Sequence, residues 1–176
     1  MLRLTRMLRG RFHMTALASG LSLVLLAALG AGALAGELPK QGTYSLTWTF
    51  SGPYTAIEIG EDQWAWSSTS NLILWNDAGE GFGHDMSGIC VGMGSEEPGA
   101  PFTDSGYCSY VDADGDKLFD YWYETEAGKG TSTWLGGTGK YAGAQGTDTY
   151  EFVLTPDAPE GTFNGYGHTE GSYKLR

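Results

Sequence analysis

Basic side chains are scarce in this sequence of 176 residues once its first 35 residues are set aside. Residues 36–176 hold five lysines and one arginine, Arg176, against 21 acidic side chains, so their formal charge is −15. A domain with that excess of negative charge repels phosphate backbones and anionic lipid surfaces. We therefore expect no nucleic-acid partner, and we interpret the charge as that of a soluble, acidic protein.

Cysteine is also rare, because the chain has only Cys90 and Cys108. Two thiols without a C-x-x-C motif do not make a zinc site of the usual four-ligand kind, so we expect no metal. If the chain reaches an oxidising compartment, the two cysteines are expected to form a disulfide. In the chain-entropy view such a bond contributes roughly 3 kcal/mol.

Apolar residues at helical spacing are missing after Gly36, so we expect no long helix. The period is close to two instead, as in Tyr44–Phe50, where apolar side chains alternate with hydroxyl side chains. Turn residues at 51–53, 76–79 and 112–116 divide the chain into short pieces. The predicted strands are 44–50, 64–75, 82–93, 107–111, 117–124, 130–135, 146–154 and 163–175.

Residues 1–35 have the pattern of a cleavable signal peptide. A basic segment with four arginines precedes the apolar run Ala16–Leu29, and Ala33–Ala35 fits the A-x-A rule for a cut before Gly36. The alternative is an uncleaved anchor, but the apolar run is shorter than the roughly 20 residues of a bilayer span. We predict export to a periplasm or to the medium, no stable membrane insertion after cleavage, and one domain over residues 36–176.

About eight short antiparallel strands with regular turns favour an all-β barrel or sandwich. A closed barrel removes the strand edges that would otherwise aggregate, but the strand pattern itself leaves barrel and sandwich open.

The segment Gly136–Gly146 is the most distinctive motif. It is not a phosphate-binding loop of the P-loop kind, because Tyr141 stands where Ser or Thr must follow Gly-Lys, and a strand rather than a helix comes next. We interpret it as a tight, bulged connection between strands, in which glycines adopt positive φ.

The same residues resemble the G-G-T-G-x-[FY]-x-x-[AI]-x-G segment of the allene oxide cyclase and dirigent superfamily. The resemblance covers roughly residues 40–175, and the acidic run and the two cysteines look like those of exported bacterial members. It implies an eight-stranded barrel that uses no cofactor, and a homo-oligomer is one arrangement that such barrels adopt. Dirigent-type radical coupling does not transfer, because it is thought to need a lumen arginine and Arg176 is at the chain end.

The run Asp112–Asp116 has three carboxylates at alternate positions, which suggests calcium as one interpretation. Lys117 and Tyr123 occupy the positions where an EF-hand has its glycine and its bidentate glutamate, so the default is a solvated turn between strands.

Aromatic and acidic residues on the predicted strands are the candidates for a lumen site. In an eight-stranded barrel such side chains either fill the interior or line a pocket for one small ligand. The candidate lining residues are Trp48, Trp66, Trp75, Tyr121, Tyr123, Glu124, Trp134 and Glu151.

The sequence therefore favours an exported, non-catalytic barrel that binds a small apolar molecule or has a structural role. The alternative, which the resemblance implies, is a cofactor-independent cyclase or isomerase of a reactive lipophilic intermediate. That alternative requires Glu124 or Glu151 to face the lumen. No catalytic residue can be assigned from the motifs.

Overall fold

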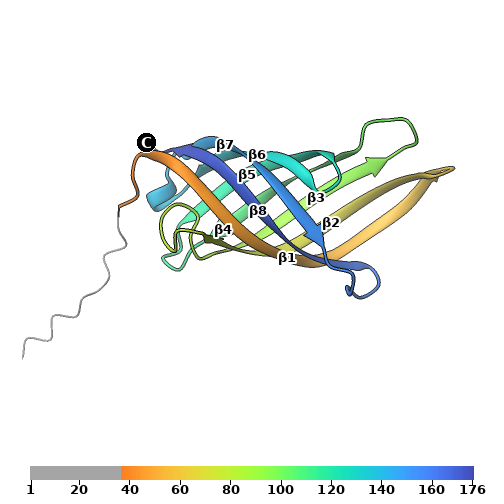
Figure 1. Cartoon of the computed structure of the whole chain (residues 1–176), viewed down its shortest axis with the longest axis horizontal. Helices are drawn as coiled ribbons and strands as arrows, with labels where there is room; N and C mark the ends of the chain where they lie inside the picture. The colour runs from red at the N-terminus through yellow and green to blue at the C-terminus, as the bar shows by residue number, and fades with distance from the viewer. Residues whose placement is uncertain (1–36) are drawn as a thin grey trace, which may run out of the picture. The chain divides into compact units, whose positions relative to one another are not determined.

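A computed structural model describes residues 37–176, which form a closed antiparallel barrel of eight strands in chain order (Figure 1). The predicted fold class is confirmed, and the only helix among these residues is one 3₁₀ turn, η1 (Gly139–Tyr141). The strands are β1 (Gln41–Gly60), β2 (Gln63–Asn76), β3 (Met86–Glu96), β4 (Thr103–Val111), β5 (Lys117–Glu126), β6 (Lys129–Gly137), β7 (Gln145–Leu154) and β8 (Thr162–Lys174).

The pairing of β1 with β8 closes the barrel, with a register that runs from Gln41 opposite Lys174 to Pro53 opposite Thr162. The prediction that the first strand ends at residues 51–53 is wrong, because β1 continues to Gly60. Pro53 is tolerated because it is the last residue of β1 that pairs with β8, so little of the β1–β8 ladder depends on its missing N–H. Beyond it, β1 pairs with β2 alone, and this long hairpin projects at one end of the barrel in Figure 1.

The predicted strand over residues 82–93 begins four residues later, at Met86. The chain from Asp77 to Asp85 is a loop that turns Phe82 inward, where it is 2% exposed. Its ring stacks on Tyr173, with ring centroids 4.1 Å apart, and meets Trp134 and Tyr141 edge to face. These rings pack the interior at this end, which we call the closed end.

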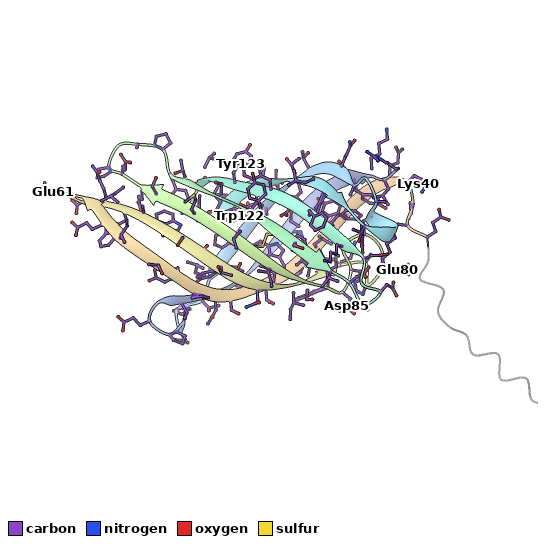
Figure 2. The ribbon with its side chains drawn as sticks, turned by 180° about the vertical axis from the view of Figure 1, so that it is seen from behind. Lys40, Glu61, Glu80, Asp85, Trp122 and Tyr123 are labelled. Carbon is purple, nitrogen blue, oxygen red and sulfur yellow. A yellow bond between two sulfur atoms is a disulfide. The ribbon has the colours of Figure 1, made fainter. Side chains whose placement is uncertain are left out.

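The opposite end, called the rim, is formed by the connections 61–62, 97–102, 127–128 and 155–161. Glu61 lies at the rim in Figure 2, whereas Lys40, Glu80 and Asp85 lie at the closed end. The buried hydrophobic cluster is concentrated toward the closed end and includes Leu38, Leu46, Leu118 and Leu175. The barrel is therefore packed at one end only.

Inward glycines allow aromatic rings to lie flat on the barrel wall. A Cβ added at Gly92 would be 2.6 Å from Cζ2 of Trp122, and one added at Gly167 would be 2.4 Å from Cζ2 of Trp48. A ring that lies over a glycine of the next strand projects less into the centre than a ring packed over a larger side chain. This arrangement keeps space in the lumen.

The predicted signal peptide, residues 1–35, lies outside the described residues. Within residues 37–176, no helix is long and apolar enough to cross a membrane.

Candidate ligand-binding lumen

A cavity of about 580 Å³ lies in the barrel interior and extends from the rim, where Phe102 lines it, to Leu46 and Trp134. That volume is typical of a site for one small molecule. Ring side chains dominate its wall, and they are Trp48, Phe50, Tyr54, Trp66, Phe102, Tyr110, Trp122, Trp134, Tyr150, Phe152 and Phe163. The alternation of β1 explains part of this set, because Trp48 and Phe50 share the inward face with Leu46.

Half of the predicted lining residues contribute to this cavity. Trp48, Trp66, Glu124 and Trp134 all line it. The other half are not lining residues, namely Trp75, Tyr121, Tyr123 and Glu151.

The reason is strand parity, because neighbouring residues on a strand face opposite sides of the sheet. Trp75 follows inward Leu74, while Tyr121 and Tyr123 flank inward Trp122, so all three point outward. Figure 2 labels the neighbours Trp122 and Tyr123 on β5. Glu151 likewise follows inward Tyr150 and is exposed on the outer face of β7.

Three carboxyl groups of the lumen, Asp104, Asp120 and Asp148, were missed as site residues. Asp120 could have been found from its spacing, because it lies four residues before Glu124 on β5 and therefore faces the same side of the sheet. Asp104 lies directly opposite Glu124 in the β4–β5 register. That pairing depends on which residues of two strands align, and the sequence pattern leaves this open.

Asp148 is held in a complete hydrogen-bond network. Its carboxylate accepts bonds from the Tyr44 hydroxyl at 2.7 Å and from the Ser132 hydroxyl at 2.6 Å. Trp134 Nε1 in turn donates to the Tyr44 oxygen at 2.7 Å. Burial, together with the charge of Asp148, raises the pKa of Tyr44, so its phenol stays protonated. Asp148 is thus a structural carboxylate of the inner wall.

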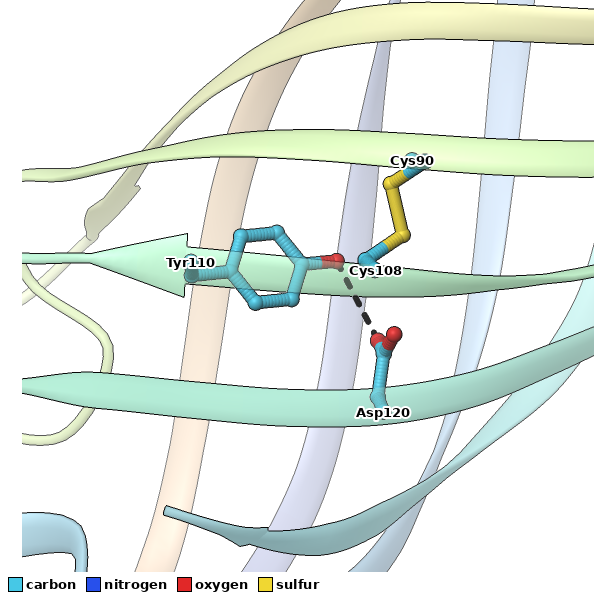
Figure 3. Close-up of a disulfide and its surroundings, with 4 residues drawn as sticks. All are labelled: Cys90, Cys108, Tyr110 and Asp120. Carbon is cyan, nitrogen blue, oxygen red and sulfur yellow. Dashed lines mark hydrogen bonds between the residues drawn. A yellow bond between two sulfur atoms is a disulfide. The ribbon is translucent and has the colours of Figure 1, made fainter. Parts of the chain in front are cut away.

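Only one of the two carboxyl oxygens of Asp120 has a hydrogen-bond partner. Its Oδ2 accepts a bond from the Tyr110 hydroxyl at 3.2 Å (Figure 3). Its Oδ1 is buried without a partner. Burial and the nearby charge of Asp148 raise the pKa of Asp120 to about 8, so it can hold a proton at neutral pH. The carboxyl group is therefore available to a molecule in the cavity.

The predicted disulfide between Cys90 and Cys108 is present and joins β3 to β4 beside Asp120 (Figure 3). The two cysteines are directly opposite in the β3–β4 register, and Cys108 is opposite Asp120 in the next pair of strands. Both cysteines are buried and line the cavity. A buried disulfide is compatible with a protein that resides in an oxidising compartment.

Asp104 and Glu124 form a second acidic pair nearer the rim. Trp66 Nε1 donates to Asp104 Oδ2 at 3.0 Å, and the Gly128 N–H donates to Glu124 Oε2 at 3.2 Å. Burial and the charge of Asp104 raise the pKa of Glu124 to about 7, and burial also raises the pKa of Asp104. Two facing carboxyls disfavour each other's charge unless a proton or a cation lies near them.

The acidic turn 112–116 meets the glycine-rich segment. Lys140 Nζ lies 2.7 Å from Asp112 Oδ2 and 2.8 Å from Asp114 Oδ2, and the Lys140 N–H donates to Asp116. An added Cβ at Gly139 would lie 1.7 Å from Asp116 Oδ1, so glycine is required there. The lysine ammonium thus pairs with two of the three carboxylates that suggested calcium. Nowhere in residues 37–176 do three or more His, Cys, Asp or Glu side chains form a group able to hold a metal ion.

Ser45, Asp77 and His168 come together on the outer wall, away from the cavity. The Ser45 hydroxyl donates its proton to Asp77 and lies 3.4 Å from His168 Nε2. A serine whose proton is bonded to a carboxylate is not activated by the histidine, and these side chains are exposed rather than set in a pocket. The lumen is the better candidate site.

No protein-family model matches the sequence, and no curated protein matches it. Among solved structures, this chain is similar to the pterocarpan synthase dirigent protein GePTS1, with 12% identity, a TM-score of 0.48, and coverage of 78% of this chain and 88% of that one. It is also similar to the pterocarpan synthase dirigent protein PsPTS1, with 11% identity, a TM-score of 0.47, and coverage of 78% and 98%.

Both are dirigent proteins, the group suggested by residues 136–146. At these identities the likeness concerns the fold alone. The eight-stranded closed antiparallel barrel is the fold that the resemblance implied.

Proposed function

We propose that this protein is an exported barrel that binds one small lipophilic molecule in its lumen. The observation that carries the proposal is the 580 Å³ cavity, which is walled by many aromatic side chains and extends from the rim to residues of the buried core such as Leu46 and Trp134. Apolar surface of this kind drives the burial of an apolar ligand. The buried carboxyl groups supply a few polar contacts that would orient such a ligand.

The rim supplies a route of entry. Tyr54, which lines the cavity, is 43% exposed, and the rim connections contribute Phe102 and Ala158 to the lining. A ligand could enter there without opening the packed closed end. Export fits the disulfide, because such a bond persists outside a reducing cytosol.

A cavity-filling substitution tests the proposal. Ser70 lines the cavity on β2, and its neighbour Asn71 is exposed on the outer face. We expect Ser70→Phe to weaken binding of the neutral probe N-phenylnaphthylamine by at least about tenfold, the equivalent of about 1.4 kcal/mol. Asn71→Phe adds the same ring outside and should leave binding unchanged. Binding is measured by probe fluorescence and by quenching of tryptophan emission.

If Ser70→Phe and Asn71→Phe lost probe binding to the same extent, or both retained it, the result would contradict a lumen site. Failure of the unmodified protein to bind any of a panel of neutral lipophiles would contradict the proposal as a whole.

A second candidate function is the cofactor-independent cyclase or isomerase. It is favoured by one observation, that Glu124 faces the lumen and has a pKa raised to about 7, which suits a general acid or base near neutral pH. Glu151 has no part in it. Turnover of a reactive lipophilic epoxide that Glu124→Gln abolishes and Glu151→Gln preserves would support this role.

A further inference from the structure

The acidic and basic side chains that line the cavity are all of one kind. Among the described residues that line it, four carry a carboxyl group, namely Asp104, Asp120, Glu124 and Asp148, and none is a lysine, arginine or histidine. An anionic ligand, such as a fatty acid, would face these groups without a counter-cation. The chemistry of the lumen disfavours acids and suits a ligand that brings positive charge.

The polar groups of the cavity that lack a hydrogen-bond partner include those of Asp120 and Tyr150, which are free to bind a ligand. Asp148 already accepts bonds from Tyr44 and Ser132. Asp120 is 4% exposed, lines the cavity, and has Oδ1 buried with no partner. Tyr150 is 9% exposed, lines the same cavity, and its hydroxyl also lacks a partner. A buried polar atom without a bond costs free energy, and a ligand that completes the bond recovers it.

The arrangement along β5 gives the ligand a direction. Asp120, Trp122 and Glu124 occupy alternate positions, so their side chains enter the lumen on one face in that order from the closed end toward the rim. The two carboxyl-bearing residues are about 13 Å apart along the strand, with the indole between them. A cation beside an indole ring gains a further attraction from the ring face.

We propose that the lumen takes a lipophilic amine in its protonated form, with the ammonium group hydrogen-bonded to Asp120 and the apolar body lying along Trp122 toward the rim. This inference rests on the proposed function, since it names the chemical class of the molecule bound at the same site. Glu124 and Asp104 lie on the path from the rim and attract the cation as it enters. The charge of −15 over residues 36–176 favours the approach of cations from solution.

Three ligands of nearly equal shape test the charge preference in the unmodified protein. These are naphthylmethylamine, naphthylmethanol and naphthoic acid, which are cationic, neutral and anionic at neutral pH. We expect the amine to bind at least about tenfold more tightly than the alcohol. A hydrogen bond between charged groups is stronger than one between neutral groups by about the free energy that corresponds to a tenfold change in affinity. The acid should bind most weakly. Affinities are measured by calorimetry.

Variants then locate the ammonium. Asp120→Asn keeps the shape of the side chain but cannot give up a proton to become the anionic partner of the ammonium group, so the ratio of amine to alcohol affinity should fall to about one. Glu151→Gln makes the corresponding carboxyl-to-amide change on the outer face of β7 and should preserve the ratio. Far-ultraviolet circular dichroism and thermal unfolding establish that each variant is folded.

The outcomes separate the two proposals. An alcohol that binds as tightly as the amine, or an acid that binds best, overturns the amine inference and leaves lumen binding intact. An amine preference that survives in Asp120→Asn overturns the assignment of Asp120. Absence of binding by all three ligands overturns both proposals.

Discussion

At the scale of single residues, the buried carboxyl of Asp120 is the most consequential feature. It lies between the disulfide on one side and Trp134 on the other, with one oxygen bonded to Tyr110 and the other unpartnered. Burial and the charge of Asp148 raise its pKa from 3.8 to about 8. The folded protein therefore holds a proton that the unfolded chain releases at much lower pH.

This shift predicts a pH-dependent stability. The stabilisation from protonated Asp120 is fully present below about pH 4 and is lost as the pH rises toward about 8, because the unfolded chain ionises first. We expect the free energy of unfolding to fall across this range. In Asp120→Asn the fall should be smaller, by about 1.4 kcal/mol for each pH unit over which Asp120 holds its proton in the folded protein alone. Urea unfolding at a series of pH values measures it.

Glu124, whose pKa is about 7, accounts for part of the remaining slope in that variant. A pH dependence identical in the original protein and in Asp120→Asn would show that Asp120 does not hold the proton.

At the scale of strands, inward glycines and inward aromatic residues act as pairs. Gly92 on β3 and Gly106 on β4 both lie under the indole of Trp122 from β5. Similarly, Gly165 and Gly167 of β8 lie under Phe50 and Trp48 of β1. Each pair packs a ring against the wall of the barrel without filling its centre. The abundance of glycine thus has a role in the strands as well as in the turns.

Gly92→Ala tests this pairing. The added Cβ would lie 2.6 Å from Trp122, so the indole must move into the lumen. We expect a loss of about 1–3 kcal/mol in the free energy of unfolding, the usual cost of overpacking, together with weaker binding of the neutral probe. Thermal unfolding and probe fluorescence provide the two readouts.

The matched experiment is a double-mutant cycle. In a Trp122→Leu background the same Gly92→Ala change should cost much less, because the ring that it displaces is gone. If Gly92→Ala reduced the free energy of unfolding equally in both backgrounds, the glycine would be needed for the backbone and not for packing against Trp122.

At the scale of the whole barrel, the two ends differ in packing. The closed end is filled by Phe82, Tyr141 and their neighbours, whereas the cavity extends from the core toward the rim. Residues 54–60 of β1 pair only with β2, whereas residues 41–53 pair with β8 and residues 46–51 pair with both neighbours. Stability should therefore decrease from the closed end toward the rim.

Amide hydrogen exchange measures this gradient. We expect peptides that cover residues 54–66 to exchange before those that cover residues 41–50 and 166–174, and a bound lumen ligand to slow exchange chiefly near the rim. Uniform exchange along β1 would contradict a barrel with one loosely packed end.

The period of two predicted most of the strands and their inward faces. Tyr44–Phe50 indicated a strand with one dry face, and its apolar residues do point inward. Trp75, Tyr121 and Tyr123 were grouped with the lumen because they are aromatic, although their parity places them outside. The turn predicted at residues 51–53 is wrong. Ser-Gly-Pro is also tolerated within a strand at the point where pairing with one neighbour ends, as the pairing of β1 with β8 does at Pro53.

By itself, the sequence determined that the described chain forms short antiparallel strands joined by turns and that Cys90 can pair with Cys108, and the motif at residues 136–146 indicated the barrel by resemblance. The strands follow from local alternation and turn residues. Tertiary structure decided that the lumen is packed at one end and hollow at the other, and that Asp104 faces Glu124 while Asp120 lies within reach of the charge of Asp148. These facts depend on the register of strands and on how rings pack across the barrel, and no local pattern encodes either.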